Sequence, residues 1–175
     1  TTRSGVQNSE HQGAMELCIR ALGRLKSTDP KSHVIADYLD RTNRLAPNLG
    51  FRASTVESHE VSGNFVGTAL KNREGQWLLS RVTERDHVIA LDERGKDMES
   101  ASIANHLARQ RDDGAPRLVF LVGGADGHGP EISARANAVW RFGKATWPHM
   151  LVRVMLCEQI YRAMTILAGH PYHRV

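Results

Sequence analysis

The chain has 175 residues, a formal net charge of +4 and 41% hydrophobic residues, which fits one domain with a substantial core. Its longest apolar runs are far shorter than the roughly 20 residues that a membrane-spanning helix needs, so no membrane segment is expected. Cys18 and Cys157 lie far apart without CxxC spacing, which disfavours a disulfide framework and favours a reducing cytoplasm. The basic charge permits a nucleic-acid partner, but its spread along the chain does not by itself predict one.

Regular hydrophobic patterning begins at Met15, and we interpret the polar residues 1–14 as a tag remnant or a disordered extension. Over residues 15–175, short strand-like runs alternate with longer helix-like runs, without an internal repeat. This alternation predicts a single α/β domain.

The first elements of this domain have clear start and stop signals. A strand is expected to end at Gly23, and a helix to begin at Asp29 and Pro30. Aspartate accepts hydrogen bonds from free N–H groups of a first helical turn, and the fixed φ of proline suits that turn. A second strand and a second helix are predicted over residues 51–57 and 70–82.

In the second half, a strand over residues 87–91 is expected to end in a polar turn containing Gly95, and Ser100 is expected to cap the following helix. The continuous apolar run 118–122 predicts a strand covered on both faces of its sheet. Three further elements are predicted: a helix over 132–139, a short extended piece over 144–147, and a long final helix over 152–167.

The segment from Leu121 to Pro130, LVGGADGHGP, leads from a strand through a glycine-rich turn to a helix. Gly123 and Gly124 would let backbone groups approach a ligand at the carboxyl end of a strand, although a tight connection would also need such glycines. The order of the glycines differs from the dinucleotide fingerprint and no Walker lysine is present. NAD and nucleoside-triphosphate sites are therefore disfavoured.

Three other places could carry chemistry. Asp92 could accept a hydrogen bond from a ligand or cap a turn, and the cap is favoured. Trp147 is more typical of packing than of adenine contact. The tail from His170 to Arg174 is unusually rich in imidazole and guanidinium groups for a chain end, but its two histidines alone lack the further ligands of a zinc site. No metal is expected.

Together these segments resemble the RlmH family of SPOUT-class methyltransferases. The matching elements are Leu91-Asp92 with Gly95-Lys96, Gly123-Gly124 with Gly127, Pro148-His149 followed by Leu151 to Val154, Glu158 with Tyr161 to Ala163, and the tail His170 to Arg174. The chain departs from the family pattern at Ala125, Asp126, His128-Gly129 and Lys144. These departures leave the backbone contacts of the glycine loop intact but change its side chains.

The resemblance implies a SPOUT-type α/β fold: a mostly parallel sheet flanked by helices, with a C-terminal trefoil knot. It implies a homodimer that binds S-adenosylmethionine and methylates N3 of a pseudouridine in 23S ribosomal RNA, on assembled 70S ribosomes in the cytoplasm. A non-catalytic ribosome- or RNA-binding factor of the same fold is the alternative. Cofactor binding would separate the two.

The resemblance also implies functional residues by position. Cofactor contacts are carried over to Leu91, Gly123, Gly124, Gly143, Lys144, Ala145, Thr146, Trp147 and Pro148. Tyr172, His173 and Arg174 would reach the substrate, with His173 as a general base for the N3 proton. Arg153 is expected near the cofactor or the RNA, with a helix-capping or a dimer ion-pair role as the alternatives.

Overall fold

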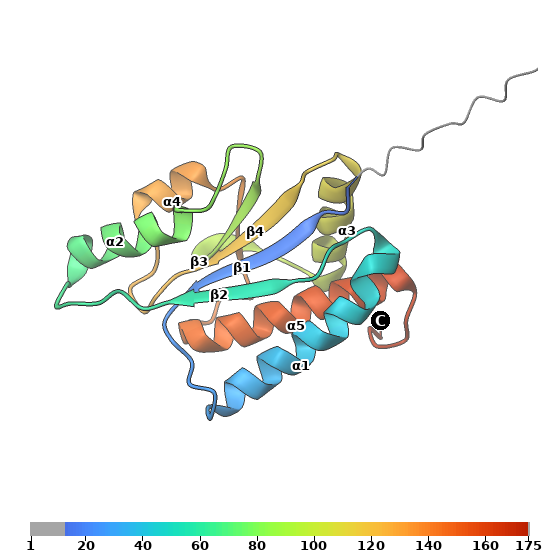
Figure 1. The fold of residues 1–175 in the computed structure, drawn as a ribbon, viewed down its shortest axis with the longest axis horizontal. Coiled ribbons are helices and arrows are strands. Elements are labelled where there is room, and N and C mark those ends of the chain that lie inside the picture. The colour runs from blue at the N-terminus through green and yellow to red at the C-terminus, as the bar shows by residue number, and fades with distance from the viewer. Residues whose placement is uncertain (1–12, 175) are drawn as a thin grey trace, which may run out of the picture.

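The structure, a computed structural model, describes residues 13–174, so the expected extension lies almost wholly outside the described residues. Five parallel strands form one sheet in the order β2-β1-β4-β3-β5 (Figure 1). The elements are β1 (Glu16–Leu22), α1 (Pro30–Leu45), the 3₁₀ helix η1 (Ala46–Leu49), β2 (Thr55–His59), α2 (Gly67–Leu79), β3 (His87–Asp97), α3 (Ser100–Asp112), β4 (Arg117–Val122), α4 (Pro130–Arg135), β5 (Ala138–Arg141) and α5 (His149–Ala168).

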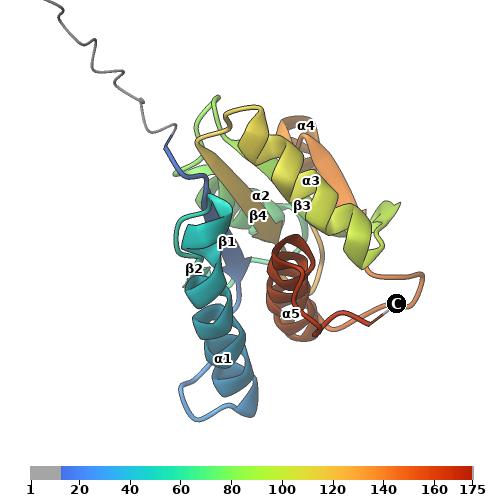
Figure 2. The same cartoon turned by 90° about the vertical axis from the view of Figure 1, so that its right-hand side faces the viewer.

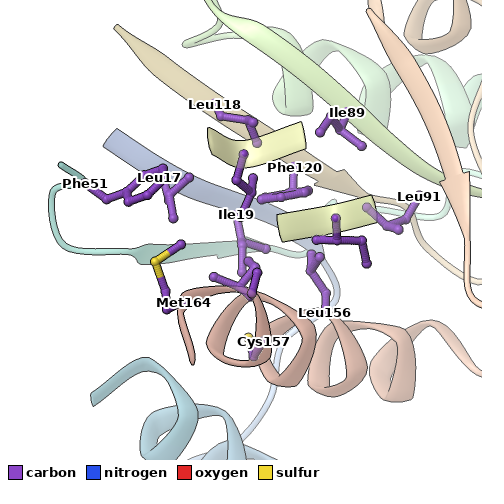
Figure 3. Close-up of a cluster of buried hydrophobic side chains, with 14 of the residues drawn as sticks. Leu17, Ile19, Phe51, Ile89, Leu91, Leu118, Phe120, Leu156, Cys157 and Met164 are labelled. Carbon is purple, nitrogen blue, oxygen red and sulfur yellow. The ribbon is translucent and has the colours of Figure 1, made fainter. Parts of the chain in front are cut away.

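Helices cover both faces of the sheet, which confirms the predicted α/β class. On one face α5 lies between α1 and α3 (Figure 2). Leu17 and Ile19 of β1 pack there with Phe120 of β4 and Leu156 of α5 (Figure 3). The other face carries α2 and α4 and a second, smaller apolar cluster. The predicted trefoil knot stays a prediction, and no helix within residues 13–174 is both long and apolar enough to span a bilayer.

The central strands are buried on both faces. This confirms the prediction for β4, but β1 alternates apolar and polar residues and is nevertheless covered on both sides. Arg20 of β1 is 1% exposed, pairs with Glu57, and donates to the carbonyl oxygens of Trp77 and Leu78 at 2.7 and 2.9 Å. Its guanidinium therefore caps the carboxyl end of α2, where a positive charge also complements the helix dipole.

Several local predictions were wrong. The expected turn at Gly95 is instead part of β3, which continues to Asp97 with a register shift against β5. Ser100 does not cap α3, because its hydroxyl donates to Gln159. The helix expected over 132–139 ends at Arg135, and the stretch 144–147 forms no strand.

The early end of α4 has a physical cause at Asn137. Its backbone N–H donates to the carbonyl of Val88, and its side-chain oxygen accepts from the N–H of the same residue, both at 2.8 Å. These two bonds align the chain with the edge of β3, so that Val139 and Trp140 continue as β5. By contrast, the predicted helix start is confirmed, because Asp29 accepts from the N–H of Lys31.

A histidine pair joins β3 to α3 and predicts acid sensitivity. The Nε2 atoms of His87 and His106 lie 2.9 Å apart, and burial together with the neighbouring His106 lowers the pKa of His87 to about 4. The unfolded chain binds its proton near pH 6.5. Stability should therefore be full above about pH 6.5 and fall as the pH drops toward about 4.

Urea unfolding at neutral and acidic pH will measure this loss. We expect the His87→Gln variant to lose less stability on acidification than the unsubstituted chain. Glutamine takes up no proton, so unfolding at acidic pH is no longer favoured by protonation of residue 87. Equal losses in the two proteins would show that the pair is not the acid-sensitive element.

Candidate functional site

A cavity of about 390 Å³ lies at the carboxyl ends of β4 and β5, beside the middle of β3. Its walls are formed by residues 91–94 of β3, the glycine-rich loop after β4, the loop after β5 and the first turn of α5, with Lys71 from α2 at one side. This size is in the range of small-molecule sites, and the carboxyl edge of a parallel sheet is where such sites form.

The glycine-rich loop after β4 presents backbone to the cavity. The N–H of Gly127 donates to the carbonyl of Gly124 at 3.1 Å, and Gly127 has a φ of 76°. A Cβ atom on Gly124 would lie 2.9 Å from a carboxylate oxygen of Glu74, and one on Gly123 would lie 3.1 Å from the ring of His128. Side chains therefore pack closely against the loop. A larger residue at Gly123 would press on the ring of His128, whereas at Gly124 the flexible end of Glu74 can move aside.

The loop between β5 and α5 forms the opposite wall. Its turn is closed by the indole N–H of Trp147, which donates to the carbonyl of Phe142 at 3.0 Å, and the indole is still 44% exposed. Trp147 is thus not core packing, contrary to the interpretation favoured from sequence. Pro148 is the N-cap residue of α5, because its carbonyl accepts from the N–H groups of Leu151 and Val152. Gly143, Ala145 and Thr146 line the cavity, whereas Lys144 and Pro148 do not.

At the end of the buried part of β3, Asp92 acts as the local cap expected of it. Its carboxylate accepts from the backbone N–H, Nε and Nη2 of Arg94, each at 2.9 Å. These bonds hold the pKa of Asp92 below its usual value. Both carboxylate oxygens are engaged, so the negative charge at this rim of the cavity is balanced by its own chain.

Arg153 is buried beneath the site rather than on its surface. The side chain is 1% exposed, Nη2 donates to the carbonyls of Leu22 and Gly23 at 2.9 Å, and Nη1 donates to the hydroxyl of Ser58 at 3.1 Å. It does not line the cavity. In this chain Arg153 ties α5 to the carboxyl ends of β1 and β2.

Removing this guanidinium should destabilise the fold. We expect Arg153→Met to cost about 1–3 kcal/mol, because it leaves buried carbonyl groups without donors. Arg44→Met is a matched control, since Arg44 forms a highly exposed i,i+4 pair with Asp40 and its loss should cost under about 0.5 kcal/mol. Urea unfolding measures both, and equal costs would contradict the buried role.

The tail does not contribute to the cavity of its own chain. It folds back on the far part of α5, away from the helix start (Figure 1). The Tyr172 hydroxyl donates to Glu158 at 3.1 Å, its ring packs on Tyr161, and His173 Nδ1 lies 3.3 Å from a guanidinium nitrogen of Arg162. Arg174 is exposed. The two groups of predicted site residues therefore lie in separate places.

Sequence reasoning missed part of the cavity lining, namely Lys71, Arg141, Phe142, His149 and Val152, and treated His128 only as a departure from the family pattern. His149 directly follows Pro148 in one of the segments that match the family, so its place in the cavity wall could have been predicted from sequence. Lys71 could not, because nothing in the sequence ties α2 to this edge of the sheet. Within residues 13–174, no three histidine, cysteine, aspartate or glutamate side chains gather as metal ligands.

Comparison with known proteins gives a consistent result along nearly the whole chain. A family model described as "Predicted SPOUT methyltransferase" matches residues 15–173. The chain is similar to "Ribosomal RNA large subunit methyltransferase H" of Afipia carboxidovorans, at 45% identity over 160 residues, and of Nitrobacter winogradskyi, at 46% over 162. The protein of the same name from Hyphomonas neptunium is 45% identical over 160 residues. Each match covers 91% of this chain and 99% of the relative.

Proposed function

The chain belongs to the SPOUT methyltransferase family, and from that membership we propose that it methylates N3 of a pseudouridine in 23S ribosomal RNA, using S-adenosylmethionine. Its relatives are named as methyltransferases of the large ribosomal subunit RNA. The observation that carries the proposal is the cavity. It gathers, from three separate segments, all but Lys144 and Pro148 of the nine residues that correspond to cofactor contacts.

The cavity fits this cofactor in size and in chemistry. Glycines at 123, 124 and 143 expose backbone donors and acceptors, the half-exposed indole of Trp147 offers a flat apolar surface, and Leu91 and Val152 add apolar walls. Such a lining suits a nucleoside with a short polar chain.

The cofactor supplies the methyl group, and the chain's own residues supply position. The two loops would hold the cofactor and the apolar walls would exclude water, so that orientation would provide most of the rate increase. Tyr172, His173 and Arg174 bind the target nucleotide, and His173 takes the N3 proton. Arg153 acts as a positioning residue, because its three hydrogen bonds fix the first turns of α5 against β1.

Because no tail residue lines the cavity of its own chain, we assign the tail to the cavity of a second copy. An apolar groove between α1 and α5 supports a homodimer. Its apolar lining is Val34, Tyr38, Met98, Phe142, Val154 and Met155, and Glu99, Ser100, Glu158 and Gln159 form its polar part. The exposed Val34 and Leu151 lie on the same two helices. An exposed apolar groove on paired helices is typical of a subunit interface.

The substrate is 23S ribosomal RNA within the assembled 70S ribosome in the cytoplasm, and neither a metal nor a membrane takes part. A positively charged chain favours association with the RNA phosphates. A non-catalytic RNA-binding factor of this fold would keep the charge without using the cofactor cavity.

One experiment separates these functions. Ribosomes from cells that lack the modification are incubated with the protein and radiolabelled S-adenosylmethionine, beside separated subunits, and the labelled base is identified. We expect label at pseudouridine in the large subunit RNA, and only with assembled ribosomes. Calorimetry adds an independent readout. Absence of binding to both S-adenosylmethionine and S-adenosylhomocysteine would favour the non-catalytic factor.

A further inference from the structure

His128 is a buried imidazole in the cofactor cavity to which the proposed reaction assigns no step. It lies in the loop after β4, lines the cavity and is 6% exposed. Its ring packs directly against Gly123, where a Cβ atom would come within 3.1 Å of the ring. The imidazole is therefore part of the floor of the cavity and cannot easily turn away from a bound molecule.

The surroundings of His128 have opposing effects on the pKa of its ring. The carboxylate of Asp92 and the carbonyl groups of Leu91 and Leu121 favour a protonated ring, but burial outweighs them, so the pKa of His128 lies below its usual 6.5. The carboxylate is also already bound by Arg94. Near neutral pH the floor of the cavity is thus uncharged at this position.

Other charged groups line the cavity from each neighbouring element. They are Lys71 of α2, Asp92, Glu93 and Arg94 of β3, Asp126 of the glycine-rich loop, Arg141 of β5 and His149 of α5. Arg141 pairs with Asp97, as Arg94 does with Asp92. Of all these groups, only the two histidines have ordinary pKa values close enough to neutrality to change charge in mildly acidic solution. His149 must therefore be tested together with His128.

We propose that His128 makes the cavity selective between the methyl donor and its product, according to pH. A neutral ring admits S-adenosylmethionine, whereas a protonated ring repels its sulfonium. S-adenosylhomocysteine has lost that positive charge with the methyl group, so the protonated ring affects it much less. This inference rests on the proposed function, because it presumes that these two molecules occupy the cavity.

Calorimetry with both ligands, from about pH 6.5 downward through the range in which NMR shows the ring of His128 to take up its proton, tests the proposal. In this range the α-amino groups of both ligands stay protonated, so their own charges are constant. As the pH falls through the pKa of His128, we expect the affinity ratio of S-adenosylmethionine to S-adenosylhomocysteine to fall, by at most about tenfold per pH unit. His128→Asn keeps a planar polar side chain that takes up no proton, so its ratio should stay constant.

Two further measurements make the result decisive. His149→Gln should keep the pH dependence of the unsubstituted chain, because the proposal assigns the effect to His128. By linkage, S-adenosylmethionine should lower the pKa of His128, followed by NMR of the ring, more than S-adenosylhomocysteine does. The same ratio profile in His128→Asn, or equal pKa values with both ligands, would overturn the inference while leaving the methyltransferase function standing. Absence of binding of either ligand at pH 7 would instead overturn both.

Discussion

A mixed dimer of two inactive chains is expected to methylate ribosomes at about half the rate of the unsubstituted dimer. One chain is truncated after Pro171 and therefore lacks residues 172–175 of the tail. The other chain carries Gly124→Val in the cavity. In the mixed dimer, the intact cavity of the first chain meets the intact tail of the second. The other site combines the cavity damaged by Gly124→Val with the truncated tail. Only one of the two sites is therefore active.

Each chain alone should be inactive for a separate reason. Gly124 lines the cavity, so a valine side chain there would occupy space that the cofactor needs, even if the flexible carboxylate of Glu74, 2.9 Å from a Cβ atom, moves aside. The truncation removes the contacts of Tyr172 with Glu158 and Tyr161, which costs about 1 kcal/mol and leaves the core untouched. Circular dichroism should show both folded, and calorimetry should show cofactor binding only by the truncated chain.

The reciprocal control pairs an unsubstituted chain with one that carries both changes. If sites are completed across the dimer, this pair should be inactive, because its intact cavity receives no tail. If each chain completes its own site, this pair should retain about half the activity and the first pair none. Co-expression with two affinity tags provides both mixed dimers, and the assay on undermethylated ribosomes distinguishes the two arrangements.

Local patterns predicted the elements whose burial is uniform or whose ends carry a strong signal. The apolar run of β4 could only be a covered strand, and the long periodic stretch of α5 ends at Gly169 with a left-handed φ of 68°. The stretch 132–139 was predicted to be one helix, because Ile132, Ala136 and Val139 recur at helical spacing, yet α4 ends at Arg135 and β5 begins at Ala138. What decides it is the pairing of Asn137 with Val88, a contact between residues far apart in the sequence.

The same limit applies to the candidate site. Glycines at strand ends indicated where a ligand could lie, and their positions proved to share one cavity. Arg153, in contrast, was expected beside the cofactor or the RNA, yet its partners include Leu22, 131 residues away in sequence. Only the packing of α5 against β1 brings them together. The separation of the tail from the cavity is equally invisible in a linear motif.

Gly95→Ala is expected to cost about 3 kcal/mol or more, because the added methyl group would overlap the backbone of the neighbouring strand. A Cβ atom at this position would lie 2.7 and 2.8 Å from backbone atoms of Trp140, and 2.8 Å from the carbonyl carbon of Val139. These atoms belong to β5, whose backbone cannot rotate aside as a side chain would. Relief requires β5 to move away from β3.

Because Trp140, Arg141 and Phe142 line the cavity, such a movement should weaken cofactor binding as well as stability. Gly114→Ala is the matched control. Gly114 has a positive φ of 82° but open space around it, so alanine there should cost only about 1 kcal/mol through backbone strain and leave binding unchanged. Urea unfolding and calorimetry of both variants measure these effects. If Gly95→Ala were no more costly than Gly114→Ala, the close approach of β3 and β5 at this glycine would be refuted.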